Sequence, residues 1–267
     1  MSDAVAVILS PHYDDAVLGL GGMLAQRKAR DERSFVVTIF GGKAPSSLDL
    51  TWWNKGTGFA TNVEAEAHRS KENRNALNQL GLDAHHIVDV LFNDAQYRNE
   101  KDAEAEARLA QAVKDQIASV LSRFGGQSVS IYAPMSNGWG QLWQDSHPDH
   151  AVVHQAFIEI FRSGRFPAAA FHMYEDVVPY VNRFTHDRAK EWVEQKDRVR
   201  LEQVVIQLSE SEYSSKLASL NQYASQLNQF GEPVDTTLMS YSSLLCSSLN
   251  LTCHACEIVY KISFDEA

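Results

Sequence analysis

Two short clusters of histidine and acidic side chains stand out in this chain of 267 residues. The first spans residues 10–15 (Ser-Pro-His-Tyr-Asp-Asp), and the second spans residues 146–150 (Ser-His-Pro-Asp-His). Helix capping explains one acidic residue of the first cluster, but it explains neither the other acidic residue nor His12. Zn²⁺ accepts histidine nitrogen and carboxylate oxygen, and catalytic zinc sites use three protein ligands with one position left for water. Two histidines and one aspartate would suffice, which leaves a carboxylate to act as a base and a histidine to act on a carbonyl or a leaving group.

The apolar pattern around the clusters predicts alternating strands and helices. Residues 4–9 form a continuous apolar run, which is typical of a strand buried on both faces of a parallel sheet. Apolar side chains recur at helical spacing over residues 15–30, and residues 35–40 form a second β-branched run. We expect the later elements in this order: helix 62–80, strand 86–91, helix 104–123, strand 129–133, helix 149–162, strand 168–174, strand 204–208, helix 210–228 and strand 258–264.

This alternation predicts an α/β fold with a Rossmann-like open, mostly parallel sheet and helices on both faces. We expect a single domain over residues 1–267, in which residues 175–267 form a flanking C-terminal lobe. Each cluster follows a predicted strand, and the carboxyl ends of parallel strands meet at one edge of the sheet, so both clusters can converge on one metal ion. Two long segments, 41–61 and 135–146, also follow strands. Their tryptophans suit either stacking on sugar rings or ordinary packing: Trp52, Trp53, Trp139 and Trp143.

Composition limits the partners and the compartment. The formal net charge is −10, which disfavours nucleic acid because phosphate binding needs a surplus of Lys and Arg. The apolar run at residues 4–9 is too short for a signal sequence or a membrane span, so we expect a cytoplasmic protein without a membrane partner. The three cysteines all lie near the C-terminus and suit a reducing environment. Cys253 and Cys256 form a CxxC with no second pair, for which a half-buried strand is favoured over a redox or metal site.

Other catalytic classes are weakly supported. Gly19-x-Gly21 after a strand suggests a dinucleotide-binding turn, but Leu24 stands where the third glycine belongs. Two histidines and a carboxylate also describe the facial triad of non-heme Fe(II) oxygenases, whose usual fold is a β-barrel type. No GxSxG, HExxH or plausible cysteine nucleophile occurs. A third alternative is a catalytically inactive protein that binds a sugar or a metal.

Further motifs give the chain a family resemblance. The segments 11–15 and 147–150, together with Leu18-Gly19 and Gly21-Gly22, resemble the paired motifs of the PIG-L, or LmbE-like, zinc-dependent de-N-acetylases. Other residues follow in the family's order, and the resemblance runs from Leu9 to Gln226: Arg69, Glu72, Ala76, Leu80, Gly81, Tyr174, Glu175, Asp176, Pro179, Tyr180, Lys216, Ala218, Tyr223 and Ser225. The family usually has proline where Tyr13 stands and an acidic residue where Ala16 stands.

The resemblance implies a site and a reaction. It implies that His12, Asp15 and His150 bind Zn²⁺, with Fe²⁺ or another divalent metal left open. It implies that Asp14 is the general base and that His147 assists at the carbonyl oxygen or the leaving nitrogen. Arg69 would contact substrate hydroxyls, or else simply pair along its helix with Glu72 or Asn73. The expected substrate is a small N-acetylated molecule of the N-acetylglucosamine type, which would yield acetate and a free amine. A homo-oligomer is left open.

Overall fold

The computed structural model describes residues 4–98, 102–135, 147–176, 186–227 and 234–264. Seven strands form one sheet in the order β3-β2-β1-β4-β5-β7-β6. The first five strands in the chain are mutually parallel, whereas β7 is antiparallel to both of its neighbours, β5 and β6. The strands are β1 (Val5–Ser10), β2 (Ser34–Thr38), β3 (Ile87–Asp89), β4 (Val129–Pro134), β5 (Ala169–Tyr174), β6 (Val199–Leu208) and β7 (Ala255–Phe264). The predicted α/β fold with a mostly parallel sheet is confirmed.

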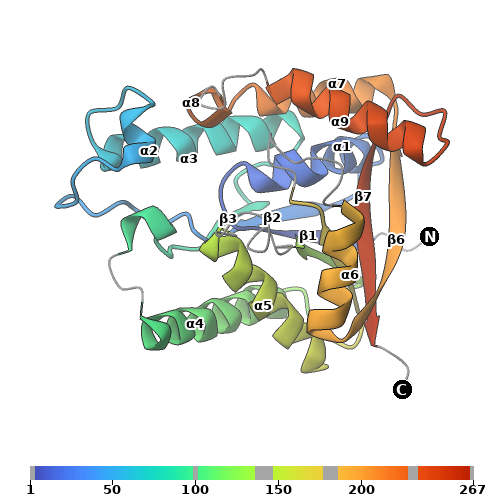
Figure 1. Cartoon of the computed structure of the whole chain (residues 1–267), viewed down its shortest axis with the longest axis horizontal. Helices are drawn as coiled ribbons and strands as arrows, with labels where there is room; N and C mark the ends of the chain where they lie inside the picture. The colour runs from blue at the N-terminus through green and yellow to red at the C-terminus, as the bar shows by residue number, and fades with distance from the viewer. Residues whose placement is uncertain (1–3, 99–101, 136–146, 177–185, 228–233, 265–267) are drawn as a thin grey trace.

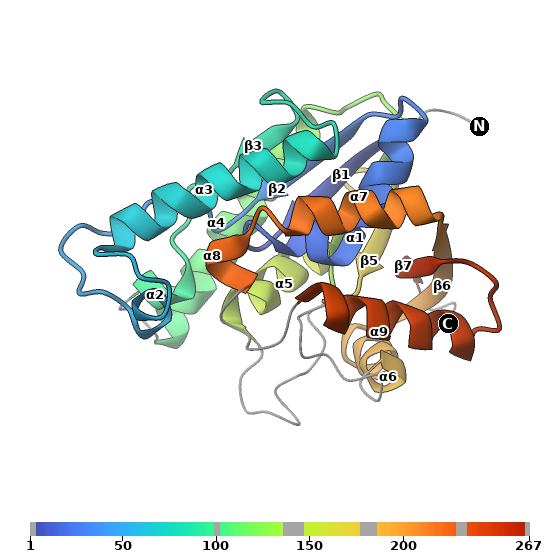
Figure 2. The same ribbon diagram turned by 90° about the horizontal axis from the view of Figure 1, so that it is seen from above.

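Helices cover both faces of this sheet. Figure 1 shows α1 (Asp15–Ala29), α3 (Asn62–Gln79) and α7 (Glu210–Leu220) on one side, and α4 (Ala103–Ser122), α5 (Pro148–Arg162) and α6 (His186–Asp197) on the other. Seen from above, α8 (Ala224–Leu227) continues the line of α7 toward α3, and α9 (Val234–Ser248) lies beside β7 (Figure 2). The short helices α2 (Trp52–Lys55) and η1 (Ala95–Tyr97) follow β2 and β3. No helix in the described parts of the chain has the length and apolar character needed to cross a membrane.

Two apolar clusters, one on each face of the sheet, make up most of the core. Every residue of β1 is buried, and its side chains alternate between the clusters: Val5, Val7 and Leu9 pack with α4 and α5, whereas Ala6 and Ile8 pack with α1 and α3. Full burial of an aliphatic side chain stabilises the fold by roughly 1.5–3 kcal/mol, so this strand is firmly anchored. The segment that follows it therefore starts from a well-defined position.

The predicted elements match the described ones to within a few residues up to β5. Four helices of the described residues were not predicted: α2, η1, α6 and α9. The predicted helix 210–228 is interrupted, because α7 ends at Leu220 and the chain turns before α8. Tyr223 lies at this turn, fully buried, with its hydroxyl 2.9 Å from the main-chain oxygen of Tyr13. The C-terminal strands β6 and β7 extend the same sheet, although a single domain over the whole chain stays a prediction.

Candidate metal and active site

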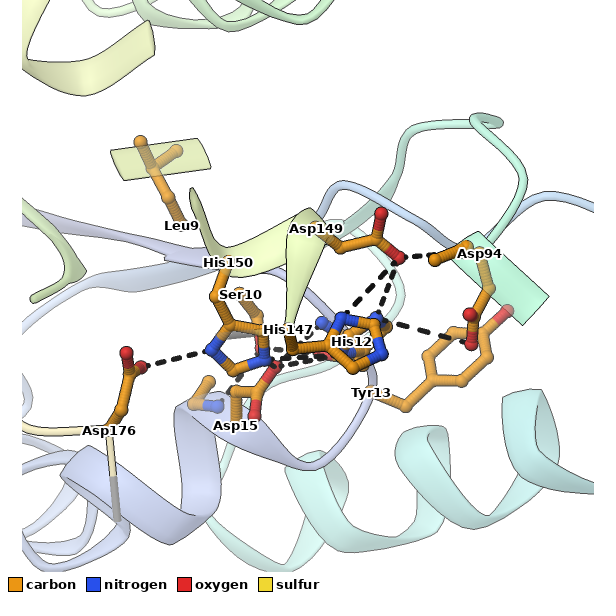
Figure 3. A network of polar contacts seen from close by, with 12 residues as sticks. Leu9, Ser10, His12, Tyr13, Asp15, Asp94, His147, Asp149, His150 and Asp176 are labelled. Carbon is orange, nitrogen blue, oxygen red and sulfur yellow. Dashed lines mark hydrogen bonds and ion pairs between the residues drawn. The ribbon is translucent and has the colours of Figure 1, made fainter. Parts of the chain in front are cut away.

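The two sequence clusters meet at the carboxyl ends of β1 and β4, which are neighbours in the sheet. Residues 11–14 connect β1 to α1, which begins at Asp15, and His147 immediately precedes α5. Figure 3 shows the side chains of His12, Asp15, His147 and His150 pointing toward one another from the starts of these two helices and the residues just before them. This is the crevice position in which open α/β sheets bind ligands.

The turn after β1 leaves both aspartates free of capping. Asp14 occupies the residue before α1, but its side chain makes no capping hydrogen bond. Ser10 serves there instead, because its Oγ accepts from the amide of Ala16 at 3.0 Å and donates to the carbonyl of His12 at 2.6 Å. Asp15 Oδ2 accepts from the amide of His12 at 2.8 Å. Neither aspartate therefore caps α1 through a side-chain hydrogen bond, although Asp15 lies in the first turn of α1, where a carboxylate complements the helix dipole; α5 likewise begins without a side-chain cap from His147.

Three predicted ligand atoms form a nearly equilateral triangle. His12 Nδ1 lies 3.4 Å from Asp15 Oδ2, His150 Nε2 lies 3.2 Å from the same oxygen, and the two nitrogens are 3.3 Å apart. Ligand atoms about 2.1 Å from a tetrahedral ion are separated by roughly 3.4 Å, so these three side chains fit one divalent cation. His147 also offers a nitrogen within 4.8 Å of those of His12 and His150.

A carboxylate contacts each histidine of the triangle at the ring nitrogen that points away from the triangle. His12 Nε2 lies 3.0 Å from Asp149 Oδ2, and His150 Nδ1 lies 3.2 Å from Asp176 Oδ1. Asp149 is itself held, because Ala95 donates its amide to Oδ2 at 2.9 Å and Arg98 forms an ion pair with Oδ1 at 2.6 Å. A carboxylate behind a ligating histidine fixes its tautomer and its ring orientation. One nitrogen of each ring is thus occupied by a hydrogen bond to a carboxylate, and the second nitrogen faces the triangle.

A second group of ligand atoms borders the first. His12, Asp94, His147 and Asp149 each offer an atom within 4.8 Å of the others. In this group, however, His12 Nε2 and Asp149 Oδ2 already bond to each other, His147 Nδ1 lies 3.9 Å from Asp149 Oδ2, and His12 Nε2 lies 4.0 Å from Asp94 Oδ2. The tighter triangle of His12, Asp15 and His150 therefore fits a single ion better.

The pKa values of the two adjacent aspartates are shifted in opposite directions. Burial raises the pKa of Asp14 to about 6, and the charge of Asp15 adds to the rise. Burial acts on Asp15 in the same direction, but His150 and His12 outweigh it and hold the pKa of Asp15 well below its usual value. Burial and the neighbouring charges of His12 and His150 lower the pKa of His147 to about 4, which makes this imidazole neutral at pH 7. Asp14 is thus the more basic of the two carboxylates, as a proton acceptor should be.

Arg69 lies beside this site, inside the protein. It is 3% exposed, and its Nη2 donates to Asn54 Oδ1 at 2.6 Å, whereas its Nε has no hydrogen-bond partner among the described residues. Glu66, one turn before Arg69 on α3, interacts with the hydroxyl of Tyr13. The charges of Arg69 and His12 favour the ionised form of Glu66. Burial raises the pKa of Glu66 to about 7. Contact between Arg69 and a substrate stays a prediction.

The sequence alone did not assign several residues of this site. Asp149 and Asp176 lay within recognised motifs, but their hydrogen bonds to the histidines depend on tertiary contacts. Asp94 and Arg98 carried no sequence signal. Among the loop tryptophans, Trp52 is 78% exposed and its ring lies against that of Trp53. Trp139 and Trp143 lie outside the described residues, as do Pro179 and Tyr180.

Comparisons with known proteins agree with this fold. The deacetylase of the teicoplanin biosynthesis pathway superposes with a TM-score of 0.77 at 21% identity, covering 98% of this chain and 99% of that one. The N,N'-diacetylchitobiose deacetylase from Pyrococcus horikoshii gives 0.56 at 17% identity, covering 97% and 83%. The 4-carboxy-2-hydroxymuconate hydratase from Pseudomonas putida gives 0.57 at 17%, covering 99% and 98%. No curated protein matches.

Family membership rests on the sequence itself. The profile of the PIG-L family, described as GlcNAc-PI de-N-acetylase, matches residues 7–161, which is more than half of the chain and includes both histidine-aspartate clusters. The structural likenesses, all below 25% identity, bear on the fold, and that fold is shared by deacetylases and a hydratase. The chain therefore belongs to the PIG-L family.

Proposed function

We propose that this chain hydrolyses the N-acetyl amide of a small amino-sugar-type molecule and that the reaction depends on a divalent cation. The observation that carries the proposal is the triangle of His12, Asp15 and His150, with ligand atoms 3.2–3.4 Å apart, beside a carboxylate whose pKa is raised. Three protein ligands leave a coordination position open, which is typical of catalytic rather than structural zinc sites.

The residues divide the work of amide hydrolysis. A divalent cation in the triangle would act as a Lewis acid toward the acetyl carbonyl and make a water molecule more acidic. Asp14 takes the proton as the water oxygen bonds to the acetyl carbon. His147 donates a hydrogen bond where negative charge develops on the carbonyl oxygen. The C–N bond then breaks, the proton passes to the leaving nitrogen, and the products are acetate and a free amine.

Support for the substrate class is chemical and comparative. The family description names a GlcNAc-linked substrate, and one protein of similar fold is a diacetylchitobiose deacetylase. Arg69 and Asn54 offer buried polar groups near the site that suit sugar hydroxyls. A teicoplanin deacetylase of similar fold has a zinc-inhibited form, so the identity of the native ion has to be tested rather than assumed. A cytoplasmic location and any homo-oligomer stay predictions.

The test combines metal reconstitution with product analysis. The protein is stripped with a chelator, reloaded separately with Zn²⁺, Fe²⁺, Co²⁺ or Mn²⁺, and incubated with N-acetylglucosamine, diacetylchitobiose and N-acetylglucosaminides. We expect equal amounts of acetate and primary amine with at least one ion and none with the stripped protein. Binding of these sugars without release under every ion would instead support an inactive binding protein and contradict the proposal.

A further inference from the structure

All three cysteines of the chain meet at one place outside the candidate active site. Cys246 lies on α9, Cys253 lies in the connection after it, and Cys256 is the second residue of β7. The Sγ of Cys246 is 3.1 Å from that of Cys253 and 3.4 Å from that of Cys256, and all three sulfur atoms lie within 4.8 Å of one another. The CxxC alone did not reveal this cluster, because Cys246 is supplied by a helix that was not predicted.

The backbone holds the three thiols in this arrangement. The amide of Leu251 donates to the carbonyl of Cys246 at 2.9 Å, and Asn250 takes a φ of 53°, which lets the chain reverse after α9. The hydroxyl of Ser242 accepts from the amide of Cys256 at 3.0 Å and donates to its carbonyl at 3.2 Å. The turn and the strand are therefore tied to α9 by hydrogen bonds that do not involve sulfur.

Two of the three cysteines are buried, and the third is partly exposed to solvent. Cys246 and Cys256 are 5% and 3% exposed, whereas Cys253 is only half-buried. Cys246 and Cys256 pack in the apolar core, as buried cysteines usually do, and in addition their sulfur atoms and that of Cys253 lie close to one another. The half-exposed Cys253 leaves a path from solvent.

We propose that Cys246, Cys253 and Cys256 form a binding site for a thiophilic cation, Zn²⁺ or Cu⁺. Thiolates select these ions over hard cations such as Mg²⁺ and Ca²⁺. Sulfur atoms about 2.3 Å from one ion lie roughly 3.8 Å apart, so Cys246 would have to move away from Cys253 by about 0.7 Å and from Cys256 by about 0.4 Å. Each thiol loses its proton to solvent as its S–metal bond forms, so full occupation releases three protons.

The number of sulfur ligands agrees with this chemistry. His254 follows Cys253, but its ring lies near that of Tyr213, with the ring centroids 5.8 Å apart. The site thus offers three sulfur ligands, which suits three-coordinate Cu⁺, or Zn²⁺ with a solvent ligand.

The cluster also joins elements that reach the candidate active site. It links the C-terminal half of α9 to the start of β7. On the same helix, Tyr241 donates a hydrogen bond to Glu175, the neighbour of Asp176, which contacts His150. A bound ion would therefore stiffen a helix that supports one carboxylate behind the candidate metal triangle. The cysteine site itself does not depend on the proposed reaction.

Cadmium tests the site directly, because ultraviolet charge-transfer absorption arises from Cd²⁺ bound to thiolate and not from histidine or carboxylate ligands. The full-length protein is kept reduced with a phosphine and titrated with Cd²⁺. We expect the band to saturate at one equivalent per chain and to disappear when a chelator removes the Cd²⁺. The thermal midpoint should rise with the band.

Two variants and a thiol count complete the test. Cys253→Ser, at the half-exposed position, should fold like the parent and weaken Cd²⁺ binding by more than about 100-fold. His150→Ala, which alters only the other candidate metal site, should keep the full band. Absence of the band in the parent, or its persistence in Cys253→Ser, would overturn the proposal. The proposal would also be overturned if only one thiol could be titrated in the reduced, chelator-treated protein, because the other two cysteines would then form a disulfide that resists reduction.

Discussion

At the scale of single residues, adjacent carboxylates have opposite environments. Asp14 and Asp15 share one turn, yet the histidines lower the pKa of Asp15 while burial raises that of Asp14 to about 6. Pairs of titratable groups whose pKa values are pushed apart commonly divide acid, base and binding roles. Here Asp15 is suited to bind a cation and Asp14 is suited to accept a proton.

The first prediction separates metal binding from turnover. Asp15→Ala removes one corner of the triangle, so we expect it to lose the metal together with activity. His147→Ala should keep the metal and lose about 10²–10³-fold in kcat, because a preorganised donor to developing charge is lost. Metal analysis and acetate release check both. Asp15→Ala that retains the parent's metal content would show that the ligand assignment is wrong.

The second prediction concerns Glu66, whose pKa is raised from 4.5 to about 7 by burial. A carboxyl whose pKa is higher in the folded protein than in the unfolded chain destabilises the fold as pH rises. The loss begins at the pKa of the unfolded chain and is complete above the pKa of the folded protein, because the unfolded chain ionises first. Glu66→Gln should therefore match the parent near pH 4 and become more stable above pH 7, by at most about 3 kcal/mol. Urea unfolding at several pH values measures this.

The matched control is Glu191→Gln, at an exposed position on α6. It also removes one negative charge, but we expect it to change the free energy of unfolding by less than about 0.5 kcal/mol at every pH. A pH-independent effect of Glu66→Gln would mean that the pKa of this carboxyl is the same in the folded and the unfolded chain, which contradicts the prediction.

At the scale of elements, helix α1 is shaped by a buried ion pair. Its backbone departs from helical geometry at Leu20, and Glu257 of β7 accepts from the amides of Gly22 and Met23, each at 2.8 Å. Lys216 of α7 donates to the same carboxylate at 2.7 Å, and both side chains of the pair are almost fully buried. The glycines of α1 permit this close packing, because a Cβ on Gly22 would lie 2.2 Å from a methyl carbon of Leu208. They therefore serve helix packing, which weakens the dinucleotide-binding alternative.

The third prediction tests that pair. Lys216→Met leaves Glu257 as a buried charge without its cation, so we expect a loss of about 3–5 kcal/mol in the free energy of unfolding. Arg108→Met on α4 breaks an exposed pair with Glu104 and should cost at most about 1 kcal/mol. Denaturant titration compares the two. Similar losses in both variants would contradict a special role for the buried pair.

At the scale of the whole molecule, both candidate metal sites connect distant parts of the chain. The histidine-aspartate triangle joins the turn after β1 to the start of α5, and the cysteine cluster joins α9 to β7. An ion that binds only the folded state adds RT ln(1 + [L]/Kd) to stability. Metal occupancy should therefore be visible in unfolding experiments as well as in activity.

The fourth prediction uses this linkage. In a Cys253→Ser background, Zn²⁺ at about 100 times its Kd for the triangle should raise the free energy of unfolding by about 2.7 kcal/mol. A chelator should reverse the gain, and adding Asp15→Ala should abolish it. If the double variant is still stabilised by Zn²⁺ to the same extent, the ion binds elsewhere.

The sequence by itself predicted the α/β class, the strands of a mostly parallel sheet and most of the long helices, and it singled out the two histidine-aspartate clusters. Continuous apolar runs and helical periodicity are local signals, and both clusters lie next to such signals at strand ends. Helices α6 and α9 were not predicted, although the periodicity of their apolar residues is no weaker than that of α1 and α3, which were predicted. Only the tertiary structure placed Asp149 and Asp176 behind the histidines, bent α1 around Glu257 and brought Cys246 to the CxxC. These contacts join residues from separate elements, and side-chain spacing along one segment cannot reveal which other segment will pack against it.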